Sequence, residues 1–190
     1  MLYLASQSPR RHQLLQQLGV DFSVLQVEVA ESRAADESPH DYVSRVAYDK
    51  ARAGMAHVGM SADTLVLGAD TEVVLEDVVF GKPQDATAAA AMLRRLSGHT
   101  HTVISVVWLL GSGHESCASC LSRVRFASMD AAAIERYVAT GEPFGKAGGY
   151  AIQGQGAAWI DYLEGSYSGV MGLPLFETAE LLRECKVMPL

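Results

Sequence analysis

The order of apolar and polar residues changes its period several times along the chain, and each period indicates a different element. Short apolar runs bounded by turn residues predict strands, whereas apolar residues spaced three or four apart predict helices. The predicted strands cover residues 2–4, 22–29, 64–68, 72–80, 101–110, 116–126, 150–152 and 157–162. Residues 72–80 are expected to form a hairpin that turns at Glu76-Asp77, and residues 111–113 join the two long strands.

Five segments carry helical spacing, and most have a recognisable start and stop. Ser8-Pro9 and Ser38-Pro39 open the first two helices, because a serine caps free N–H groups and a proline fits the first helical position. The others begin at Asp85, at Ser128 or Asp130, and near Pro174, and the stops lie at Gly19, about Ala53, Ser97-Gly98 and Gly141. Strands and helices alternate early and hairpins fill the middle, so the pattern predicts an α/β protein with a mixed β-sheet.

The composition supports a folded protein with a sizeable core. Of 190 residues, 49% are hydrophobic, and the longest strongly apolar run, Val103–Leu110, is far too short to span a bilayer. The N-terminus has no basic segment followed by an apolar stretch and a cleavage site, so we expect no signal peptide and a cytoplasmic location. A net charge of −7 argues against nucleic-acid binding, although a local basic cluster can still bind a small anion.

The three cysteines predict no disulfide framework. Cys117 and Cys120 have the spacing of a metal or redox pair, but a zinc site needs a second pair of ligands and only His114 is near. A redox pair opens a helix after a strand, whereas this pair leads into a predicted strand. We therefore expect neither function at these cysteines.

The stretch LASQSPRR, residues 4–11, places two arginines in the first turn of the first predicted helix. The helix dipole is already positive there, so each cation is disfavoured by roughly 0.3–1 kcal/mol unless an anion lies opposite. One interpretation is a capped helix with two solvated arginines. The other is a phosphate site, formed by free helix N–H groups with the side chains of Ser6, Ser8, Arg10 and Arg11.

A second candidate is GADTEVV, residues 68–74, in which Gly68-Ala69-Asp70 is expected to close an apolar strand. Strand ends are where open α/β sheets bind ligands. Taken alone, Asp70 is more typical of an ordinary turn residue. Three further charged residues at predicted element ends are candidates to face the same cleft: Glu31, Lys50 and Lys82.

A third candidate is the glycine-rich stretch KAGGYAIQGQGA, residues 146–157. Its glycines permit close approach of the backbone to a ligand, or simply tight turns. Gly154-Gln155-Gly156 lacks the third glycine and the strand–helix context of a dinucleotide-binding motif. The sequence contains no Walker A motif, and GSYSG at 165–169 has Tyr167 where a serine nucleophile would stand.

Together these stretches resemble the Maf family of nucleoside triphosphate pyrophosphatases. The matching blocks, in order, span nearly the whole chain: LASQSPRR, YVSRVAYDKA, GADTEVV, GKPQD, LSGHTHTV, GEPFGKAGGYAIQGQGA and GSYSGVMGLPL. GADT and KAGGYAIQG are similar to the branch that acts on dTTP and UTP, whereas the branch for methylated or modified nucleotides tends to carry Gln in place of Thr71. The chain departs from the family pattern at Ser105 and Gly169, and we expect neither residue to touch the chemistry.

The resemblance implies one Maf-like domain over residues 1–190. The implied fold is that of Maf and inosine-triphosphatase-like proteins, an elongated mixed β-sheet flanked by helices with two lobes around a central cleft. It also implies a divalent metal, Mg²⁺ or Mn²⁺, a nucleoside triphosphate substrate and often a homodimer. No nucleic-acid or membrane partner is expected.

The implied reaction is attack of water on the α-phosphorus, which releases pyrophosphate and a nucleoside monophosphate. We expect Asp70 to deprotonate or orient the water and to share metal binding with Glu31. Negative charge on the leaving pyrophosphate would be neutralised by Arg10, Arg11, Lys50 and Lys82. Base choice is assigned to Thr71 and Gln153, and the glycine-rich loop must hold Gln153, because a free amide can flip to suit either type of base.

Two other functions stay open from the sequence. One is a pyrophosphatase for deaminated purine nucleotides, which a panel of substrates would distinguish. The other is a non-catalytic, nucleotide-binding regulator of septum formation, a process with which the family is associated. The presence of Asp70, Lys82 and Glu31 argues against the regulator, because a pure binding protein need not keep them. The physiological substrate could also be a modified pyrimidine nucleotide.

Overall fold

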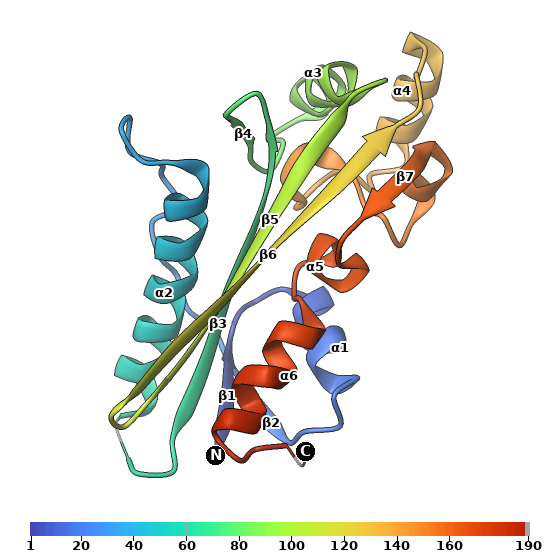
Figure 1. The fold of residues 1–190 in the computed structure, drawn as a ribbon. Coiled ribbons are helices and arrows are strands. Elements are labelled where there is room, and N and C mark those ends of the chain that lie inside the picture. Colours follow the sequence, from blue (N-terminus) through green and yellow to red (C-terminus); the bar gives the residue numbers. More distant parts are fainter. Residues whose placement is uncertain (60, 189–190) are drawn as a thin grey trace. The chain divides into compact units, whose positions relative to one another are not determined.

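The computed structural model describes residues 1–59 and 61–188 (Figure 1). Its strands are β1 Leu2–Ala5, β2 Phe22–Leu25, β3 Leu65–Leu75, β4 Val78–Phe80, β5 Thr100–Gly111, β6 His114–Phe126 and β7 Ile160–Glu164. Its helices are α1 Pro9–Gln16, α2 Pro39–Val58, α3 Ala86–Leu96, α4 Ala131–Ala139, α5 Tyr167–Met171 and α6 Leu175–Glu184. Two short 3-10 segments are η1 Ala147–Gly149 and η2 Gln155–Trp159.

The described strands form a mixed sheet in the order β2-β1-β3-β5-β6-β7, with β4 paired on β3. β1 runs parallel to both of its neighbours, with Leu2 opposite Phe22 of β2 and Leu65 of β3. β4 is antiparallel to β3, and β7 is antiparallel to β6. The predicted class, an α/β protein with a mixed sheet flanked by helices, is confirmed. The elongated form and the central cleft stay predictions.

Contacts divide the chain into two compact units that are interleaved in sequence. Unit 1 comprises Met1–Thr71, Ser105–Cys120 and Gly172–Leu190, and unit 2 comprises Glu72–Ile104 and Leu121–Met171. Strands β3, β5 and β6 each contribute residues to both units. The sequence analysis expected one domain over residues 1–190. That expectation stays a prediction, because a division by contacts does not test it.

In unit 1, helix α2 packs on β1, and glycines allow the helix to come close to the sheet. A Cβ at Gly68 of β3 would lie 2.4 Å from the carbonyl oxygen of Ala47 and 2.5 Å from the nitrogen of Ala51, both in the α2 backbone. A Cβ at Gly54 of α2 would lie 2.8 Å from Val66. These distances are too short for a side chain, so the observed approach of helix and sheet requires glycine at both positions.

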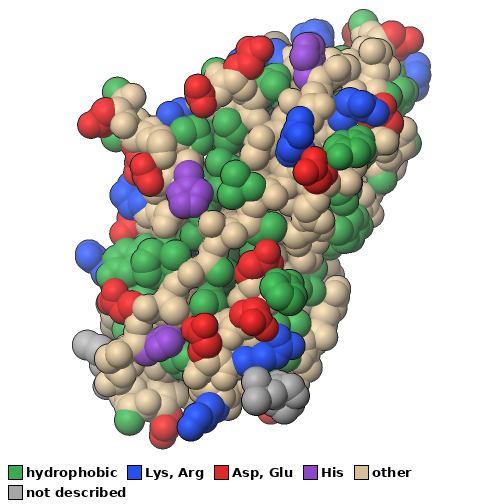
Figure 2. All heavy atoms as spheres, in the orientation of Figure 1, with side chains coloured by type: hydrophobic (Ala, Val, Ile, Leu, Met, Phe, Trp, Pro, Cys, Tyr) green, Lys and Arg blue, Asp and Glu red, His purple; other side chains and the backbone are tan. Residues whose placement is uncertain are grey.

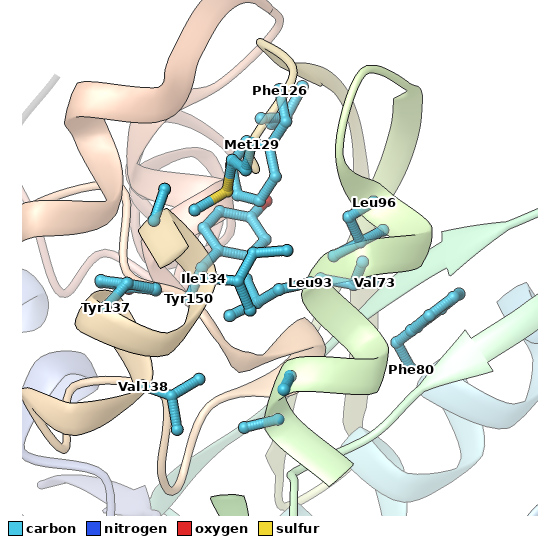
Figure 3. Close-up of a cluster of buried hydrophobic side chains, with 14 of the residues drawn as sticks. Val73, Phe80, Leu93, Leu96, Phe126, Met129, Ile134, Tyr137, Val138 and Tyr150 are labelled. Atoms are coloured by element: carbon cyan, nitrogen blue, oxygen red, sulfur yellow. The ribbon is translucent and has the colours of Figure 1, made fainter. Parts of the chain in front are cut away.

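The main core of unit 2 is a cluster of buried side chains from α3, α4 and the neighbouring strands (Figure 3). Helices α3 and α4 are in contact, and they contribute Leu93, Leu96 and Ile134 to the cluster. Phe126 and Tyr150 add a T-shaped ring pair with centroids 4.8 Å apart. This core anchors the loops that follow α4, in which Gln153 lies.

Several boundaries differ from the predictions. β3 continues through Asp70 to Leu75 instead of ending near Gly68, and β4 pairs with its last residues. β2 ends at Leu25 instead of residue 29. Residues 150–152, all described, form no strand, because the chain turns at Gly148 and Gly149 with φ of +69° and +68°. Helix α5 has no counterpart among the predicted elements.

The helix caps and the hairpin turn follow the sequence closely. Each capping side chain accepts a hydrogen bond from an N–H of the first turn of its helix. The distances are 3.5 Å for Ser8, 3.1 Å for Ser38, 2.7 Å for Asp85 and 2.7 Å for Asp130. Between the two candidates for the cap of α4, the structure therefore selects Asp130. Glu76 and Asp77 both have positive φ, at 52° and 62°, as a tight hairpin turn requires.

Two observations bear on membrane spans and on the distribution of surface charge. Among the described residues, no helix has the length and apolar character needed to cross a bilayer. On the face shown in Figure 2, acidic and basic side chains are interspersed rather than gathered by sign.

Candidate active site

Asp70 lies in β3 just beyond the point where its parallel neighbour β1 ends. The last pair in the β1–β3 register is Ala5 opposite Gly68, and Asp70 follows two residues later. The residue is buried, with 5% of its surface exposed. The prediction that Asp70 closes its own strand is wrong, because β3 is longer than expected. It is the shorter strand β1 that ends beside it.

Lys50 of α2 links two acidic side chains. Its Nζ lies 2.7 Å from Asp70 Oδ1 and 2.6 Å from Glu31 Oε1. The side chains of Lys50 and Asp70 are 10% and 7% exposed, whereas that of Glu31 is 34% exposed. The close approach of α2 to Gly68 brings the lysine within reach of β3. The structure thus brings together three of the four charged residues that the sequence assigned to one cleft.

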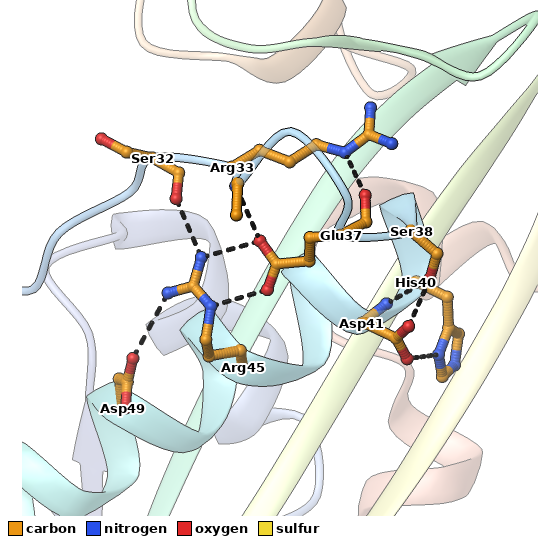
Figure 4. Close-up of polar contacts among 9 residues, drawn as sticks. Ser32, Arg33, Glu37, Ser38, His40, Asp41, Arg45 and Asp49 are labelled. Atoms are coloured by element: carbon orange, nitrogen blue, oxygen red, sulfur yellow. Dashed lines mark hydrogen bonds and ion pairs between the residues drawn. The ribbon is translucent and has the colours of Figure 1, made fainter.

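The loop that carries Glu31 is tied to α2 by an arginine (Figure 4). Arg45 donates from Nε and Nη2 to the two carboxylate oxygens of Glu37, at 2.7 and 3.0 Å, and from Nη2 to the Ser32 carbonyl oxygen at 2.9 Å. Asp49 lies 3.5 Å from the same guanidinium. The hydrogen bond from Arg45 is the main cause that lowers the pKa of Glu37. Because Ser32 follows Glu31 directly, the hydrogen bond from Arg45 to the Ser32 carbonyl fixes the backbone beside a candidate metal ligand.

Arg11 is held within unit 1 rather than projecting into solvent. Its Nε donates to the Gly172 carbonyl oxygen at 2.8 Å, and its Nη2 lies 4.0 Å from Asp70 Oδ1. Thr71 Oγ1 donates to the same Gly172 oxygen at 3.3 Å and shares a hydrogen bond with Ser105 Oγ at 2.8 Å. The carbonyl of Gly172, a residue with φ of +125°, therefore holds one side chain from α1 and one from β3.

Ser105 and Gly172 are contacts that sequence reasoning missed. Ser105 bonds to Thr71, which was assigned to base choice, so the expectation that Ser105 lies away from the candidate chemistry is wrong. The sequence did mark Ser105 as unusual, because it is the polar residue that interrupts the apolar run 103–110. Gly172 makes these contacts through its backbone carbonyl. Every residue carries that group, so the residue type does not indicate the contact.

The remaining predicted phosphate ligands lie at the start of α1. Ser6 Oγ accepts a hydrogen bond from the Ser8 N–H at 3.2 Å, and Ser8 Oγ accepts one from the Arg11 N–H. Arg10 makes no hydrogen bond or ion pair with another described residue. Partial burial, and then the charge of Arg11, lower the pKa of Arg10. An uncompensated guanidinium on the first turn of a helix is the arrangement expected of an anion site.

The carboxylates of Asp70 and Glu31 suit a hard divalent cation. Oδ2 of Asp70 is buried and has no hydrogen-bond partner among the described residues, whereas Oδ1 is bound to Lys50. Within residues 1–59 and 61–188, no cluster of three or more His, Cys, Asp or Glu is placed to hold a metal. Mg²⁺ is bound in many enzymes by one or two carboxylates, with water and substrate phosphates as the other ligands. The residues present fit that mode of binding.

Lys82 and Gln153 belong to unit 2, and each lies in a loop with a defined backbone. Lys82 is exposed in the loop after β4, and the preceding Gly81 accepts a hydrogen bond from the Gly148 N–H at 3.2 Å. Gln153 is exposed and makes no hydrogen bond with another described residue. Their roles in the reaction stay predictions, as do those of the residues in unit 1.

The three cysteines, all described, form no disulfide in the structure. Cys117 is exposed, Cys120 is buried, and neither is in a disulfide. They lie three residues apart in β6, so their side chains point to opposite faces of the strand. Cys117 and Cys120 have the sequence spacing of a metal or redox pair, but in this strand the two thiols do not face each other.

The chain is similar to known proteins over nearly its whole length. The family model described as Maf-like protein matches residues 1–185. A protein of Xanthomonas campestris pv. campestris named dTTP/UTP pyrophosphatase is 56% identical over 184 residues, which cover 96% of this chain and 97% of that protein. A protein of Xylella fastidiosa named nucleoside triphosphate pyrophosphatase is 54% identical over 183 residues, covering 96% and 97%. Among solved structures, the Ham1 protein of Staphylococcus aureus matches with a TM-score of 0.47 and 13% identity, over 66% of this chain and 71% of that one.

Proposed function

The chain belongs to the Maf family, and we propose that it is a nucleoside triphosphate pyrophosphatase that acts on dTTP and UTP. Water adds to the α-phosphorus, the bond to the bridging oxygen breaks, and a nucleoside monophosphate and pyrophosphate leave. The observation that carries the proposal is the buried Asp70 carboxylate, bound through one oxygen to Lys50 and without a partner among the described residues at the other. The relatives named dTTP/UTP pyrophosphatase, at 56% identity, support the choice of substrates.

Asp70 is proposed to orient the attacking water and accept its proton through Oδ2. Oδ1 is bound to Lys50 at 2.7 Å and lies 4.0 Å from Arg11, so Oδ2 is the oxygen left to receive a hydrogen bond. The two cations compensate a negative charge that burial would otherwise leave unpaired. A base positioned in this way contributes about 10²–10⁴-fold to the rate.

The triphosphate is proposed to bind first at Arg10, whose guanidinium has no partner among the described residues. Arg11 and Lys50 lie beside Asp70 and are suited to stabilise charge that develops on the bridging oxygen. Lys82 is proposed to neutralise pyrophosphate, as the family resemblance implies. Mg²⁺ or Mn²⁺ held by Asp70 and Glu31 would, when bound, polarise a phosphoryl oxygen as a Lewis acid.

Base choice is proposed for Thr71 and Gln153. Uracil and thymine present an acceptor, a donor and an acceptor at O2, N3–H and O4, whereas cytosine presents a donor at its amino group and an acceptor at N3. A glutamine amide carries both a donor and an acceptor, so it discriminates only if its orientation is fixed. The Thr71 hydroxyl already has a defined orientation between Ser105 and Gly172.

The proposal includes a cellular setting. We infer a cytoplasmic enzyme of the nucleotide pool that works with Mg²⁺ or Mn²⁺ as a homodimer, and its link to septum formation rests on the family resemblance. None of the three cysteines, all described, is in a disulfide, which fits a reducing compartment. Light scattering of the purified protein over a range of concentrations tests the homodimer.

Release of pyrophosphate is the direct test of the activity. The purified protein is incubated with dTTP, UTP, CTP, ITP or XTP in the presence of Mg²⁺, Mn²⁺ or excess EDTA. We expect the fastest release from dTTP and UTP and none in EDTA. Preference for ITP and XTP would instead support a pyrophosphatase for deaminated purines. Tight binding of a nucleotide without release would support the non-catalytic regulator.

A further inference from the structure

Glu142 is bound by the backbone of the glycine-rich loop in unit 2. Its Oε1 accepts hydrogen bonds from the Tyr137 hydroxyl at 2.7 Å and the Gly156 N–H at 3.0 Å, and its Oε2 accepts one from the Gln155 N–H at 2.9 Å. A Cβ at Gly154 would lie 2.2 Å from Oε2, so the carboxylate occupies the space that a side chain there would need. One carboxylate therefore binds the backbone of Gln155 and Gly156 and packs against Gly154.

Tyr137 holds the other end of the same segment. Its hydroxyl donates to Glu142 and also accepts a hydrogen bond from the Ala151 N–H at 3.2 Å. The residue is 4% exposed and belongs to the core of unit 2, so its ring is held by the packing around it. Residues 151–156 are thus fixed at their start by Tyr137 and at their end by Glu142. We call this pair of residues the loop clamp.

The loop clamp needs an ionised Glu142 and a protonated Tyr137. Partial burial acts to raise the pKa of Glu142, but the hydrogen bonds from Tyr137, Gly156 and Gln155 outweigh it, and the pKa lies below its usual value. Burial, and then the hydrogen bond to Glu142, raise the pKa of Tyr137. Donor and acceptor are therefore matched at neutral pH, where hydrogen bonds to a charged acceptor are about twice as strong as neutral ones.

Gln153 lies in the middle of the segment that the loop clamp fixes. We propose that Tyr137 and Glu142 are positioning residues for base selection, which fix the backbone of residues 151–156 so that the Gln153 amide favours uracil and thymine over cytosine. This inference rests on the proposed function, which assigns base choice to Gln153. Polar groups that are held in place penalise a base with mismatched donors and acceptors, because the mismatch leaves those groups unpaired.

The main test is the selectivity of Tyr137→Phe, which removes the hydroxyl that joins both halves of the loop clamp. We expect the ratio of kcat/KM for dTTP to that for CTP to fall by about tenfold, through a higher KM for dTTP. Glu142→Gln should act in the same direction, because an amide nitrogen then faces N–H groups that need an acceptor. The matched control is Tyr162→Phe, which also removes a hydroxyl bonded to a carboxylate, that of Glu164, at an exposed position. It should keep the wild-type ratio.

Two further measurements separate positioning from a general loss of stability. Hydrogen exchange of the three amides that bond to Tyr137 and Glu142, those of Ala151, Gln155 and Gly156, should become faster in Tyr137→Phe, while the amides of α3 keep their protection. In a Gln153→Ala background, Tyr137→Phe should leave the dTTP/CTP ratio unchanged, because the side chain to be positioned is absent. Equal losses for dTTP, UTP and CTP in Tyr137→Phe, with an unchanged ratio, would overturn the inference.

The same variants distinguish this inference from the proposed function. If the wild-type protein releases pyrophosphate from no nucleotide, the proposed function fails. Calorimetric Kd values for dTTP and CTP then replace kcat/KM in the comparison. A preference for dTTP that is lost in Tyr137→Phe and kept in Tyr162→Phe supports the loop clamp, and an equal change of both Kd values contradicts it.

Discussion

The ammonium nitrogen of Lys50 lies 2.7 Å from Oδ1 of Asp70, and both side chains are buried. The pair joins α2 to β3, so it contributes to the fold of unit 1 as well as to the proposed chemistry. Breaking such a pair by removing one partner is costly, because the other charge stays buried without compensation. Glu31, more exposed and 2.6 Å from the same nitrogen, is the second carboxylate bound to this lysine.

Lys50→Met keeps most of the apolar chain of the lysine and removes its charge. We expect the free energy of unfolding to fall by about 3–5 kcal/mol, because Asp70 is left buried with only the more distant Arg11 to compensate its charge. Urea denaturation at pH 7 measures this, with Lys186→Met as the control at an exposed lysine of unit 1. Equal stability of the two variants would show that the contact with Asp70 contributes little to the fold.

Asp70→Asn keeps the shape of the side chain and removes the proposed base. We expect release of pyrophosphate from dTTP to fall by at least about 10²-fold. The fold should persist, because Lys50 keeps its contact with Glu31. Asp161→Asn, at an exposed aspartate that pairs with Arg125, is the matched control and should keep wild-type activity. An Asp70→Asn variant with more than about a tenth of the wild-type rate would exclude Asp70 as the base.

Arg10 and Arg11 are expected to respond differently to replacement by alanine. Arg11→Ala loses the hydrogen bond to Gly172 and the charge near Asp70, so the free protein should lose about 1.5–3 kcal/mol of stability. Arg10→Ala removes a cation that opposes the helix dipole, so the free protein should be unchanged or slightly more stable. Both should bind dTTP more weakly. Thermal melts with and without dTTP measure both effects, and a clear loss of stability in free Arg10→Ala would support the solvated surface helix instead.

His101 is expected to make unit 2 sensitive to acid. Burial lowers its pKa to about 4 from an ordinary 6.5, so the unfolded chain binds a proton over this range more readily than the folded chain does. The stability that the neutral ring contributes is therefore complete above about pH 6.5 and is lost as the pH falls, by about 3 kcal/mol at pH 4. Urea denaturation between pH 7 and pH 4 should show a shallower decline for His101→Gln than for the wild type. His99→Gln, at an exposed histidine, should follow the wild type, and identical slopes for all three would contradict the assignment.

Features that depend on neighbouring residues could be read from the sequence with good accuracy. Ser8, Ser38 and Asp85 cap helices as predicted, because a cap is a bond between a side chain and an N–H three residues later. The hairpin turn at Glu76 and Asp77 is local in the same sense. The ordered blocks that resemble the Maf family indicated the candidate side chains but not the distances between them.

The contacts of the candidate site join residues far apart in sequence, and none of them could be measured before the fold was known. Lys50 reaches Asp70 because α2 approaches β3 at Gly68, a consequence of helix packing that alternation of apolar residues does not encode. Thr71 is fixed by Ser105 through the packing of one long strand beside another. A hydrogen bond requires its donor and acceptor within about 3 Å, and strand register and helix approach set that distance, so packing rather than local preference determines the site.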